Sequence, residues 1–341
     1  MKSLKVGIIG AGNIATTAHI PCYKVIPGVE IVGICDRNLH NAQIIASRYN
    51  IPYAFGDYRE MFEGLHLDVV SICVPNKFHH SCTLAALDAG CNVLCEKPPA
   101  LTVAESEEME LIARRNHCLL SYDFQTRFSR EFLDLKRTLG KGDFGYISHG
   151  KAIWLRQRGI PGWGCFTDKA MQGGGPLIDI GSHILDAALN LLDYPDISYI
   201  CASWDDHIGK KGGIGNLGSW EGTSYTVEDS LFGFIGFKDG TSLEIDTSYA
   251  LNMREKEQKN ILLYGERLGA SLFPLEYYDG NKTHLVKFNG EDNPRQRLMD
   301  NFCAACRGEQ ELNITARQGI YVQKVIALLY KSAQGKCPVC L

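Results

Sequence analysis

Residues 4–15 read Leu-Lys-Val-Gly-Ile-Ile-Gly-Ala-Gly-Asn-Ile-Ala, and this stretch decides the fold of the first part of the chain. The apolar run over 4–9 predicts a buried strand, and the glycines that follow predict a tight turn into a helix. The second glycine lets the backbone approach a pyrophosphate, which the unpaired N–H groups of the helix N-terminus can bind. Ala15 is small enough for close packing where a third glycine often stands. We therefore expect a dinucleotide to contact Gly10, Gly12, Asn13 and Ile14.

Asp36 ends the second apolar run, where an acidic side chain can accept hydrogen bonds from both hydroxyls of a bound ribose. A carboxylate at this position repels a 2′-phosphate and so favours NAD over NADP. Arg37 argues in the other direction, because its guanidinium could hold such a phosphate. The sequence thus predicts NAD as the cofactor and leaves NADP as the alternative.

Short apolar runs alternate with helical patterns over the first third of the chain. Strands are predicted at 4–9, 29–35, 52–54, 68–74, 92–95 and 118–123. Nearly continuous apolar runs are typical of strands covered on both faces, as in parallel sheets. The regular alternation predicts right-handed crossovers. We therefore expect an α/β fold that begins with an N-terminal Rossmann domain over 1–123, built on a doubly wound parallel sheet.

The rhythm changes after residue 124, where longer strands joined by glycine-containing turns are predicted. The strand candidates are 146–157, 230–237, 241–249 and 259–264, and the helix candidates are 176–192, 294–307 and 315–333. This pattern indicates a C-terminal α+β domain over 124–341 with an open, mainly antiparallel sheet. The alternative is that its last helices pack back on the first domain. The Gly-rich stretch 205–225 is expected to be a long flexible loop, and one interpretation makes it a lid.

The chain has 341 residues, of which 45% are hydrophobic and 22% charged, and its formal net charge is −4. This composition is ordinary for a globular protein of two domains. The negative charge gives no electrostatic case for nucleic acid or an anionic membrane as a partner. No apolar stretch approaches the roughly 18 residues of a membrane span. Because the first strand begins at Leu4, we expect no signal peptide and a cytoplasmic location.

Thirteen cysteines are spread along the chain, several of them inside apolar strands. This pattern favours reduced, buried thiols over a disulfide framework. Two Cys-x-x-Cys pairs, Cys303 with Cys306 and Cys337 with Cys340, have a spacing that permits a zinc site. Cys303 and Cys306 fall on a predicted helix and the other two in a terminal tail, so we expect no metal.

Glu96-Lys97-Pro98 stands at the end of the fifth predicted strand. Ligands of open parallel sheets bind beyond the carboxyl ends of the strands, so Lys97 should point into the cofactor crevice. A lysine at a strand end is usually only solvated, but Pro98 and Pro99 fix the backbone direction here. We therefore interpret Lys97 as a site residue.

The run 173–183 reads Gly-Gly-Gly-Pro-Leu-Ile-Asp-Ile-Gly-Ser-His and leads into the helix predicted at 176–192. Polar side chains spaced three and four apart form one stripe along this helix: Asp179, Ser182, His183, Asp186 and Asn190. An ordinary solvated stripe would carry Lys, Glu or Arg, and 176–192 contains none of them. A stripe that is buried or faces a cleft needs partners or a ligand.

Taken together, these motifs resemble the glucose–fructose oxidoreductase / inositol dehydrogenase / MocA (Gfo/Idh/MocA) family. The resemblance covers nearly the whole chain and includes 74–76 (Val-Pro-Asn) with His79, 227–229 (Val-Glu-Asp) and 315–319 (Thr-Ala-Arg-Gln-Gly). It implies hydride transfer between NAD(P) and a sugar, polyol or related alcohol. It also implies that the open sheet joins copies of the chain into a dimer or tetramer.

The resemblance places catalysis at Lys97, Asp179 and His183. A histidine suits the general base that takes the hydroxyl proton, and a lysine can stabilise the developing alkoxide. Asp179 would orient His183 or bind a neighbouring hydroxyl. Besides the phosphate loop, the expected cofactor contacts are Asp36, Arg37, Pro75, Asn76, His79, Glu96 and Lys97.

The substrate is expected to meet the three catalytic residues together with Arg127, Arg156 and Trp163. Aromatic faces stack on sugar rings, and arginine supplies forked donors to hydroxyls or carboxylates. Trp154 and Arg158 lie in the same segment. Members of the family often carry Asn where this chain has Thr126, so the contact made by that position stays open.

Three functions compete. The first is an NAD(P)-dependent dehydrogenase acting on a secondary hydroxyl of a sugar, cyclitol or glycoside. The second is a redox-coupled glycosidase that recycles NAD and releases an aglycone without net NADH. The third is a non-catalytic dinucleotide-sensing protein, against which the retained Lys97, Asp179 and His183 argue, since a sensor needs no base.

Overall fold

The computed structural model describes residues 3–341, which form two compact units. Unit 1 comprises the chain up to Asp123 together with Asn293–Gln323, and unit 2 comprises Phe124–Asp292 with Lys324–Leu341. The first break falls where the sequence places the domain boundary. The return of 293–323 to unit 1 corresponds to the alternative in which late helices pack back on the first domain.

Unit 1 is built on a six-stranded, wholly parallel sheet. Its strands are β1 (Leu4–Ile9), β2 (Val29–Cys35), β3 (Tyr53–Phe55), β4 (Val69–Ile72), β5 (Asn92–Cys95) and β6 (Leu120–Tyr122). Their order, β3-β2-β1-β4-β5-β6, is that of a Rossmann sheet and confirms the expected fold. The order reverses between β1 and β4, and doubly wound sheets bind their ligands beyond the carboxyl ends of the strands at this point.

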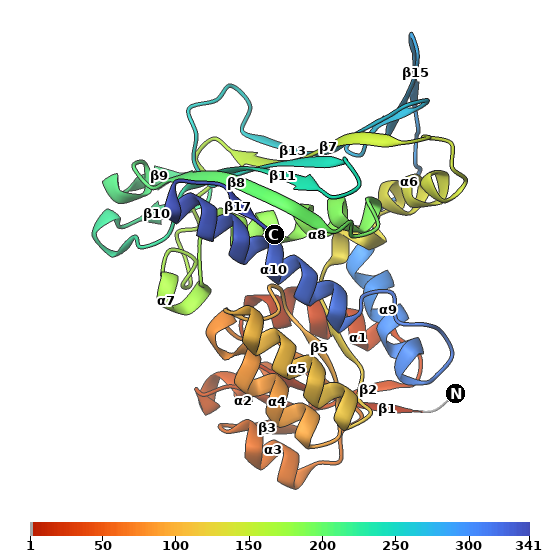
Figure 1. Cartoon of the computed structure of the whole chain (residues 1–341). Helices are drawn as coiled ribbons and strands as arrows, with labels where there is room; N and C mark the ends of the chain where they lie inside the picture. The colour runs from red at the N-terminus through yellow and green to blue at the C-terminus, as the bar shows by residue number, and fades with distance from the viewer. Residues whose placement is uncertain (1–2) are drawn as a thin grey trace. The chain divides into compact units, whose positions relative to one another are not determined.

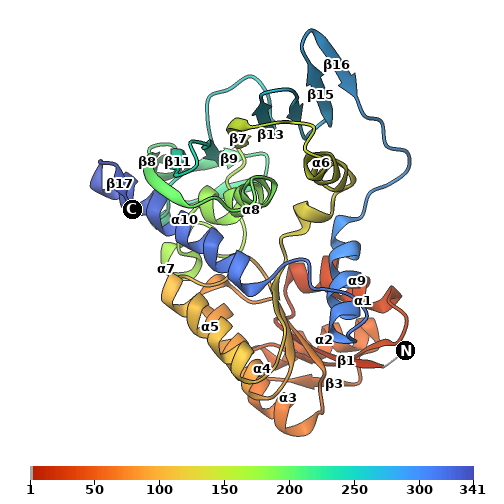
Figure 2. The same cartoon turned by 45° about the vertical axis from the view of Figure 1, so that its right-hand side comes forward.

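Helices cover both faces of this sheet, as right-handed crossovers require. They are α1 (Ile20–Val25), which continues the π-helical turn η1 (Ala15–His19), α2 (Leu39–Tyr49), α3 (Tyr58–Gly64), α4 (His79–Asp88), α5 (Val103–Arg115) and α9 (Pro294–Cys306). Figure 2 shows α1 beside α9, and α4 packs against α5. The central strands are therefore buried on both sides, and Val6, Val70 and Leu94 have no exposed surface.

Unit 2 contains a nine-stranded sheet in the order β16-β15-β14-β13-β7-β12-β11-β8-β17. Its strands are β7 (Ile147–Arg156), β8 (Ile197–Asp205), β11 (Ser230–Phe237), β12 (Ser242–Ser248), β13 (Glu257–Gly265), β14 (Gly269–Ser271), β15 (Glu276–Asp279), β16 (Lys282–Leu285) and β17 (Val339–Cys340). Only β7 and β12 run parallel; the other neighbours are antiparallel. The mainly antiparallel sheet expected from the sequence is confirmed.

One face of this sheet is covered by helices and the other is open. In unit 2, α8 (Ser182–Leu191), which continues the π-helical turn η4 (Leu177–Gly181), packs on β7, and Leu329 of α10 (Ala316–Gly335) packs at Gly233 of β11. Figure 1 shows α8 and α10 on the same side of the sheet. Two further helices, α6 (Arg130–Gly140) and α7 (Lys169–Gln172), complete the unit. Antiparallel sheets commonly bury one face and leave the other accessible.

The stretch 205–225 is not the structureless loop expected from its composition. It contains β9 (Gly213–Gly215), paired antiparallel with β10 (Gly218–Trp220), between two short 3-10 turns. Trp220 is buried in an apolar cluster with Ile160 and Tyr225, and its indole N–H donates to the Gly209 carbonyl at 2.9 Å. The glycine content predicted a flexible loop. The segment is ordered instead, because the buried Trp220 anchors it.

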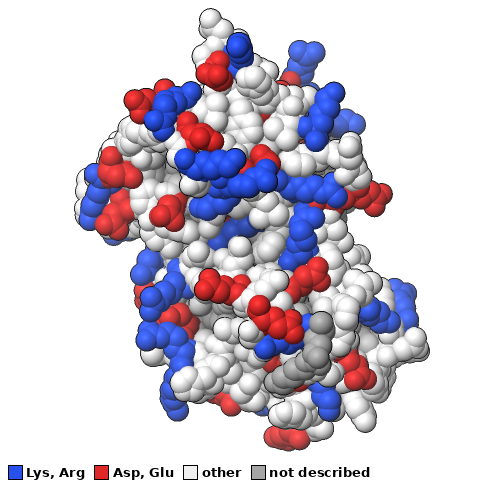
Figure 3. Space-filling model, turned by 90° about the vertical axis from the view of Figure 1, so that its right-hand side faces the viewer, with Lys and Arg blue, Asp and Glu red and all other residues white. Residues whose placement is uncertain are grey.

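Among residues 3–341, none of the helices combines the length and the apolar character that crossing a bilayer requires. On the side of the molecule drawn in Figure 3, acidic and basic side chains are intermixed, and basic ones gather over unit 2. The mixture of charges on this side agrees with the ordinary charged fraction of the sequence.

Candidate functional site

The turn after β1 has the geometry of a dinucleotide-binding loop. Gly10 has a φ of 98°, and a Cβ there would lie 2.3 Å from the carbonyl oxygen of Cys73, so the chain itself requires glycine. A Cβ at Gly12 would meet no atom within 4 Å, so the protein leaves open space in front of this residue. Folding therefore does not require glycine at position 12. The open space fits a position that the pyrophosphate of a ligand approaches closely.

Asp36 supports the phosphate loop from the end of β2. One carboxylate oxygen accepts from the N–H of Ala11 and the other from the N–H of Asn38, both at 2.9 Å. The side chain is only partly buried, so it keeps room for a ribose, and neighbouring Arg37 is exposed. These residues fit the adenosine half of NAD, and Arg37 keeps NADP open as an alternative.

The segment after β4 was expected to contribute Pro75, Asn76 and His79 to the cofactor site. His79 has no exposed surface, and its two ring nitrogens lie 2.8 Å from the Pro98 carbonyl and 3.0 Å from the Val74 carbonyl. Burial lowers its pKa despite these two bonds. His79 therefore clamps the loop after Lys97 against the end of β4, and we leave it out of the proposed cofactor contacts.

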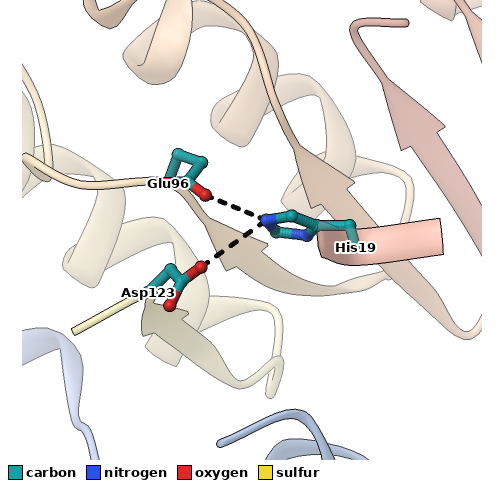
Figure 4. Close-up of side chains that lie close together, drawn as sticks. All are labelled: His19, Glu96 and Asp123. Atoms are coloured by element: carbon teal, nitrogen blue, oxygen red, sulfur yellow. Dashed lines mark hydrogen bonds and ion pairs between the residues drawn. The ribbon is translucent and has the colours of Figure 1, made fainter. Parts of the chain in front are cut away.

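Glu96 belongs to a buried charge network in unit 1, which we call the His19 network: His19, Glu96, Asp123 and Arg295. Figure 4 shows the first three of these side chains. His19 Nε2 lies 3.0 Å from Glu96 Oε1 and 3.7 Å from Asp123 Oδ2. Arg295 Nε donates to the same Asp123 oxygen at 2.7 Å. Glu96 thus holds the framework together, which makes a direct contact with the cofactor secondary to its structural role.

The charges of this network determine the pKa of each member. Burial works against a charged imidazole, but Cys73 and Glu96 outweigh it and raise the pKa of His19 to about 10. Burial alone would raise the pKa of Glu96, but the hydrogen bond and the charge of His19 hold it well below its usual range. Burial and the neighbouring Glu96 raise the pKa of Asp123 to about 6. At neutral pH the network therefore holds two cations opposite two carboxylates.

Lys97 follows Glu96 directly and is partly exposed between buried neighbours. Its backbone N–H donates to Glu96 Oε2 at 3.3 Å, so the carboxylate that His19 holds also fixes the chain direction at Lys97. The His19 network did not emerge from the sequence, since its members come from four separate segments. The only sequence signal was the charged Glu96 directly after an apolar strand.

In unit 2, the triple glycine and Glu228 together form the start of the helix that carries Asp179. A Cβ at Gly174 would lie 2.0 Å from the Tyr330 hydroxyl, and one at Gly175 would lie 2.2 Å from the Glu228 carbonyl. The buried Glu228 carboxylate accepts from the N–H groups of Gly175 and Leu177, at 2.9 and 3.3 Å. A carboxylate at a helix N-terminus satisfies donors that would otherwise lack partners. The glycines and Glu228 are therefore structural.

Asp179 and His183 occupy successive turns, Asp179 in η4 and His183 in α8. Asp179 Oδ2 accepts a hydrogen bond of 2.9 Å from the hydroxyl of the fully buried Tyr249. His183 is 8% exposed, and its ring lies 6.2 Å from the Trp154 ring and 6.5 Å from the Phe124 ring, centroid to centroid. The structure thus places a carboxylate and an imidazole on successive turns, with two aromatic rings beside the imidazole; sequence reasoning missed Tyr249 and Phe124.

Arg127 was expected to contact the substrate, and the structure gives it another role. Its side chain is fully buried, and the guanidinium forms a salt bridge with the fully buried Asp186 and donates a further hydrogen bond to the Tyr194 hydroxyl. Asp186 lies on the third turn of the polar stripe. This part of the stripe is therefore buried and satisfied by a partner within the protein. We therefore exclude Arg127 from the proposed substrate contacts.

The remaining substrate candidates, Arg156 and Trp163, contact different residues. Arg156 and the Trp154 indole N–H both bind Glu257 Oε1, at 3.1 and 2.8 Å. Trp163 is 52% exposed and stacks edge-on against Phe166. Arg156 thus belongs to the surroundings of Trp154 and His183, whereas nothing in the described contacts brings Trp163 to them.

The candidate metal ligands of the sequence, Cys303, Cys306, Cys337 and Cys340, belong to different settings. Cys303 is buried in α9, and Cys337 and Cys340 are exposed. Within residues 3–341, neither group of side chains close enough to share a metal contains a cysteine. One of those groups is formed by members of the His19 network, where hydrogen bonds and ion pairs already occupy the ligand atoms.

A Rossmann unit with an open phosphate cradle, followed by a unit that places a carboxylate and an imidazole on successive helical turns, is typical of nicotinamide-dependent oxidoreductases. Residues 4–124 match the family described as "Oxidoreductase family, NAD-binding Rossmann fold", and residues 132–270 match the "GFO/IDH/MocA C-terminal domain". The chain belongs to this Gfo/Idh/MocA oxidoreductase family, and its cofactor is NAD(P).

Individual relatives agree with this assignment. The chain is 41% identical to the "D-glucoside 3-dehydrogenase" of Escherichia coli (strain K12), over 97% of its own length and 95% of the relative's. Among solved structures, a levoglucosan dehydrogenase complexed with NADH and L-sorbose has a TM-score of 0.86 at 20% identity, and covers 100% of this chain and 99% of its own. The aldose-aldose oxidoreductase of Caulobacter crescentus has a TM-score of 0.84 at 19% identity, with 100% of both chains covered. The two structures support the fold alone.

Proposed function

We propose that this chain oxidises a secondary hydroxyl of a glucoside or a closely related sugar and passes the hydride to NAD. The oxidoreductase class follows from the family. One observation carries the substrate class: 41% identity, along nearly the full length of both chains, to a relative named for glucoside oxidation. Unit 1 provides the cofactor site, and unit 2 provides the base and the substrate contacts.

His183 is the general base in this proposal. It takes the hydroxyl proton while the C–H electron pair leaves as hydride, so the carbon–oxygen bond becomes a carbonyl. NAD, when bound, supplies the hydride acceptor. The aromatic rings of Trp154 and Phe124 restrict water around His183, which strengthens its interaction with Asp179 and the substrate.

Lys97 supplies a positive charge for the oxygen that loses its proton. An ammonium donor stabilises a developing alkoxide more than the neutral alcohol, so it lowers the barrier and not merely the energy of the bound substrate. The backbone bond to Glu96 fixes where this side chain starts. In the reverse direction the same groups return the proton to a ketone.

The test is a panel of glucosides, aldoses, polyols and sugar acids, each with NAD and with NADP, followed by NADH or NADPH absorbance. We expect turnover on glucosides with NAD, because the Asp36 carboxylate repels a 2′-phosphate. Chromatography of the same samples checks for aglycone release. Absence of reduced cofactor with every sugar would contradict the proposal.

Two variants test the assigned roles. His183→Ala and Lys97→Met should each lower turnover at least about a hundredfold, since general-base and oxyanion contacts typically contribute that much. His284→Ala, which removes an exposed histidine of β16, is the matched control and should leave turnover unchanged. Near-normal turnover by either site variant would refute the assignment of that residue.

We infer that a second copy of this chain covers the open face of the unit 2 sheet. Large aromatic side chains remain exposed there, with Phe234 36%, Tyr199 42% and Tyr264 46% accessible. They form a stacked row that includes His149, with ring centroids about 6 Å apart. Exposed apolar patches of this kind mark interaction sites. Phe234→Lys should shift the mass measured by light scattering from oligomer to monomer; a monomeric wild-type protein would exclude the interface.

A further inference from the structure

Lys259 lies on the helix-covered face of the unit 2 sheet, at the point where the apolar core ends. The paired positions of β7 and β13 on this face run from Ala152 with Ile261, both fully buried, to Trp154 with Lys259. The next pair in the same direction is Arg156 with Glu257. Lys259 therefore stands at the boundary between the hydrophobic core and the polar surroundings of Trp154.

The Lys259 ammonium lies against two aromatic rings, and the carboxylates that act on it, Glu257 and Glu131, lie beyond ion-pair distance. Its Nζ lies 4.2 Å from the centroid of the Trp154 ring and 4.9 Å from that of Phe273. Within the described chain, this side chain forms neither a hydrogen bond nor an ion pair, and it is only partly exposed. Burial lowers its pKa, since two rings replace part of its water. The ammonium thus lies at a defined position, and its N–H donors are available to a ligand.

Trp154 connects this lysine to the proposed base. The same indole ring that lies 4.2 Å from Lys259 Nζ lies 6.2 Å from the His183 ring, centroid to centroid. A monosaccharide whose reacting hydroxyl meets His183 is long enough to bring a second hydroxyl to Lys259. A lysine that only covers hydrophobic surface with its alkyl stem would extend its charge into water, and this ammonium lies against the aromatic rings instead.

The charges around Trp154 favour a neutral ligand. Lys259 and Arg156 supply two positive charges, and Glu257, Glu131 and Asp179 supply three negative ones. Glu257 is occupied by Arg156 and Trp154, and Asp179 by Tyr249. A hydroxyl accepts a charge-assisted hydrogen bond without adding charge, whereas a carboxylate would increase the excess of negative charge.

We propose that Lys259 is a specificity-determining residue, whose ammonium donates a hydrogen bond to a hydroxyl of a neutral sugar, on a carbon other than the one oxidised. This assignment rests on the proposed function, because it presumes that the sugar lies against His183. Lys259 takes no part in the proton or hydride transfer. It selects sugars that carry an oxygen at the matching position.

Lys259→Met tests this assignment, because methionine keeps the apolar stem and removes the donors. Kinetics are measured for wild type and variant on a methyl glucoside and on its four deoxy analogues, of which the one that lacks the oxidised hydroxyl is the non-reacting control. We expect kcat/KM on the parent glucoside to fall about tenfold or more, mainly through KM, as for a lost charged hydrogen bond. One deoxy analogue should be equally poor for both proteins, since it lacks the hydroxyl that Lys259 would bind.

Two further variants complete the experiment. Lys259→Arg keeps donors and charge and should recover part of the lost kcat/KM. Lys282→Met removes an exposed lysine from β16 and should change nothing. Equal loss on every analogue, or no loss on the parent, overturns the proposal. Unchanged thermal unfolding and NADH affinity of Lys259→Met show that the variant is folded.

Calorimetric binding of the glucosides to the NADH complex separates this proposal from the proposed function. If glucosides bind but are not oxidised, the proposed function fails, and the deoxy series read as affinities still tests Lys259. Weaker binding of the parent glucoside by Lys259→Met, matched by one deoxy analogue, then supports it. If no neutral glycoside binds the wild-type protein, the Lys259 assignment fails as well.

Discussion

At the scale of single residues, Tyr249 is the partner that gives Asp179 a defined orientation. Tyr249 is fully buried, and its hydroxyl donates a hydrogen bond to Asp179 Oδ2 at 2.9 Å. A hydrogen bond to a charged group contributes about 1.5–3 kcal/mol when its partner is buried. The carboxylate of Asp179 is therefore held in place by the residue that directly follows β12, 70 residues away in the sequence.

Tyr249→Phe should lower kcat about tenfold, because it removes only the hydroxyl that orients Asp179. The ring that fills the apolar cluster with Ile160 and Trp220 stays, so the protein should remain folded. NADH affinity, measured by fluorescence titration, should be unchanged, because the cofactor residues belong to unit 1. A variant with full kcat, or one whose NADH affinity falls as much as its kcat, would contradict this role.

The sequence could single out Lys97, Asp179 and His183, because each stands in a local pattern. Asp179 and His183 share one helix, and Lys97 follows one strand. Their partners could not be inferred, since contacts such as Tyr249 with Asp179 or Trp154 with Lys259 depend on strand register and packing. Arg127 shows the converse: its position next to the first domain suggested a ligand contact, whereas the structure pairs it with the buried Asp186.

At the scale of elements, the His19 network joins four pieces of unit 1. His19 comes from the helix after the phosphate loop, Glu96 follows β5, Asp123 follows β6, and Arg295 begins α9. His19 Nδ1 also reaches the Ser71 hydroxyl of β4 at 3.1 Å, and Ser71 bonds to Tyr23 at 2.8 Å. Breaking such a buried network by removing one partner is costly, because charges are left without compensation.

The raised pKa of His19 makes this contribution depend on pH. A histidine whose pKa rises from 6.5 to about 10 on folding stabilises the folded state fully below pH 6.5, and this stability is lost as pH rises towards 10. His19→Gln should therefore be less stable than wild type by a few kcal/mol at most near neutral pH, and the difference should shrink by pH 10. Urea unfolding of both proteins at several pH values measures it. A difference that stays constant across this range would show that His19 is neutral in the folded protein.

The accuracy of the predicted elements follows the strength of their periodic pattern. The strand predicted at 29–35 coincides with β2, and that at 230–237 with β11. In contrast, β8 was missed. It lies next to the edge strand β17 and alternates exposed residues such as Tyr199 with buried ones such as Ile200, so its sequence has no continuous apolar run. The pair β9 and β10 was missed because glycine content suggested disorder, whereas burial of Trp220 provides the order.

At the scale of the whole molecule, the chain passes between its units after Asp123, after Asp292 and after Gln323. The two folds themselves were predictable, since a parallel and an antiparallel sheet leave different patterns. The discontinuous makeup of unit 1 was foreseen only as an alternative, because the helix at 294–306 is amphipathic in either setting. The proposed cofactor residues around the phosphate loop and the proposed pair of Asp179 and His183 therefore belong to different units.

Two glycines of the phosphate loop separate folding from cofactor binding. Gly12→Ala places a methyl group in open space, so the protein without cofactor should unfold at the wild-type temperature. Gly10→Ala places it 2.3 Å from the Cys73 carbonyl at a φ of 98°, so this variant should be destabilised without cofactor. NADH at about a hundred times its Kd should stabilise the wild-type protein by about 2.7 kcal/mol. Thermal unfolding with and without NADH should show that Gly12→Ala loses most of this gain, because its methyl group occupies the space the pyrophosphate needs. If Gly12→Ala responds to NADH as wild type does, the cofactor does not approach the chain at Gly12.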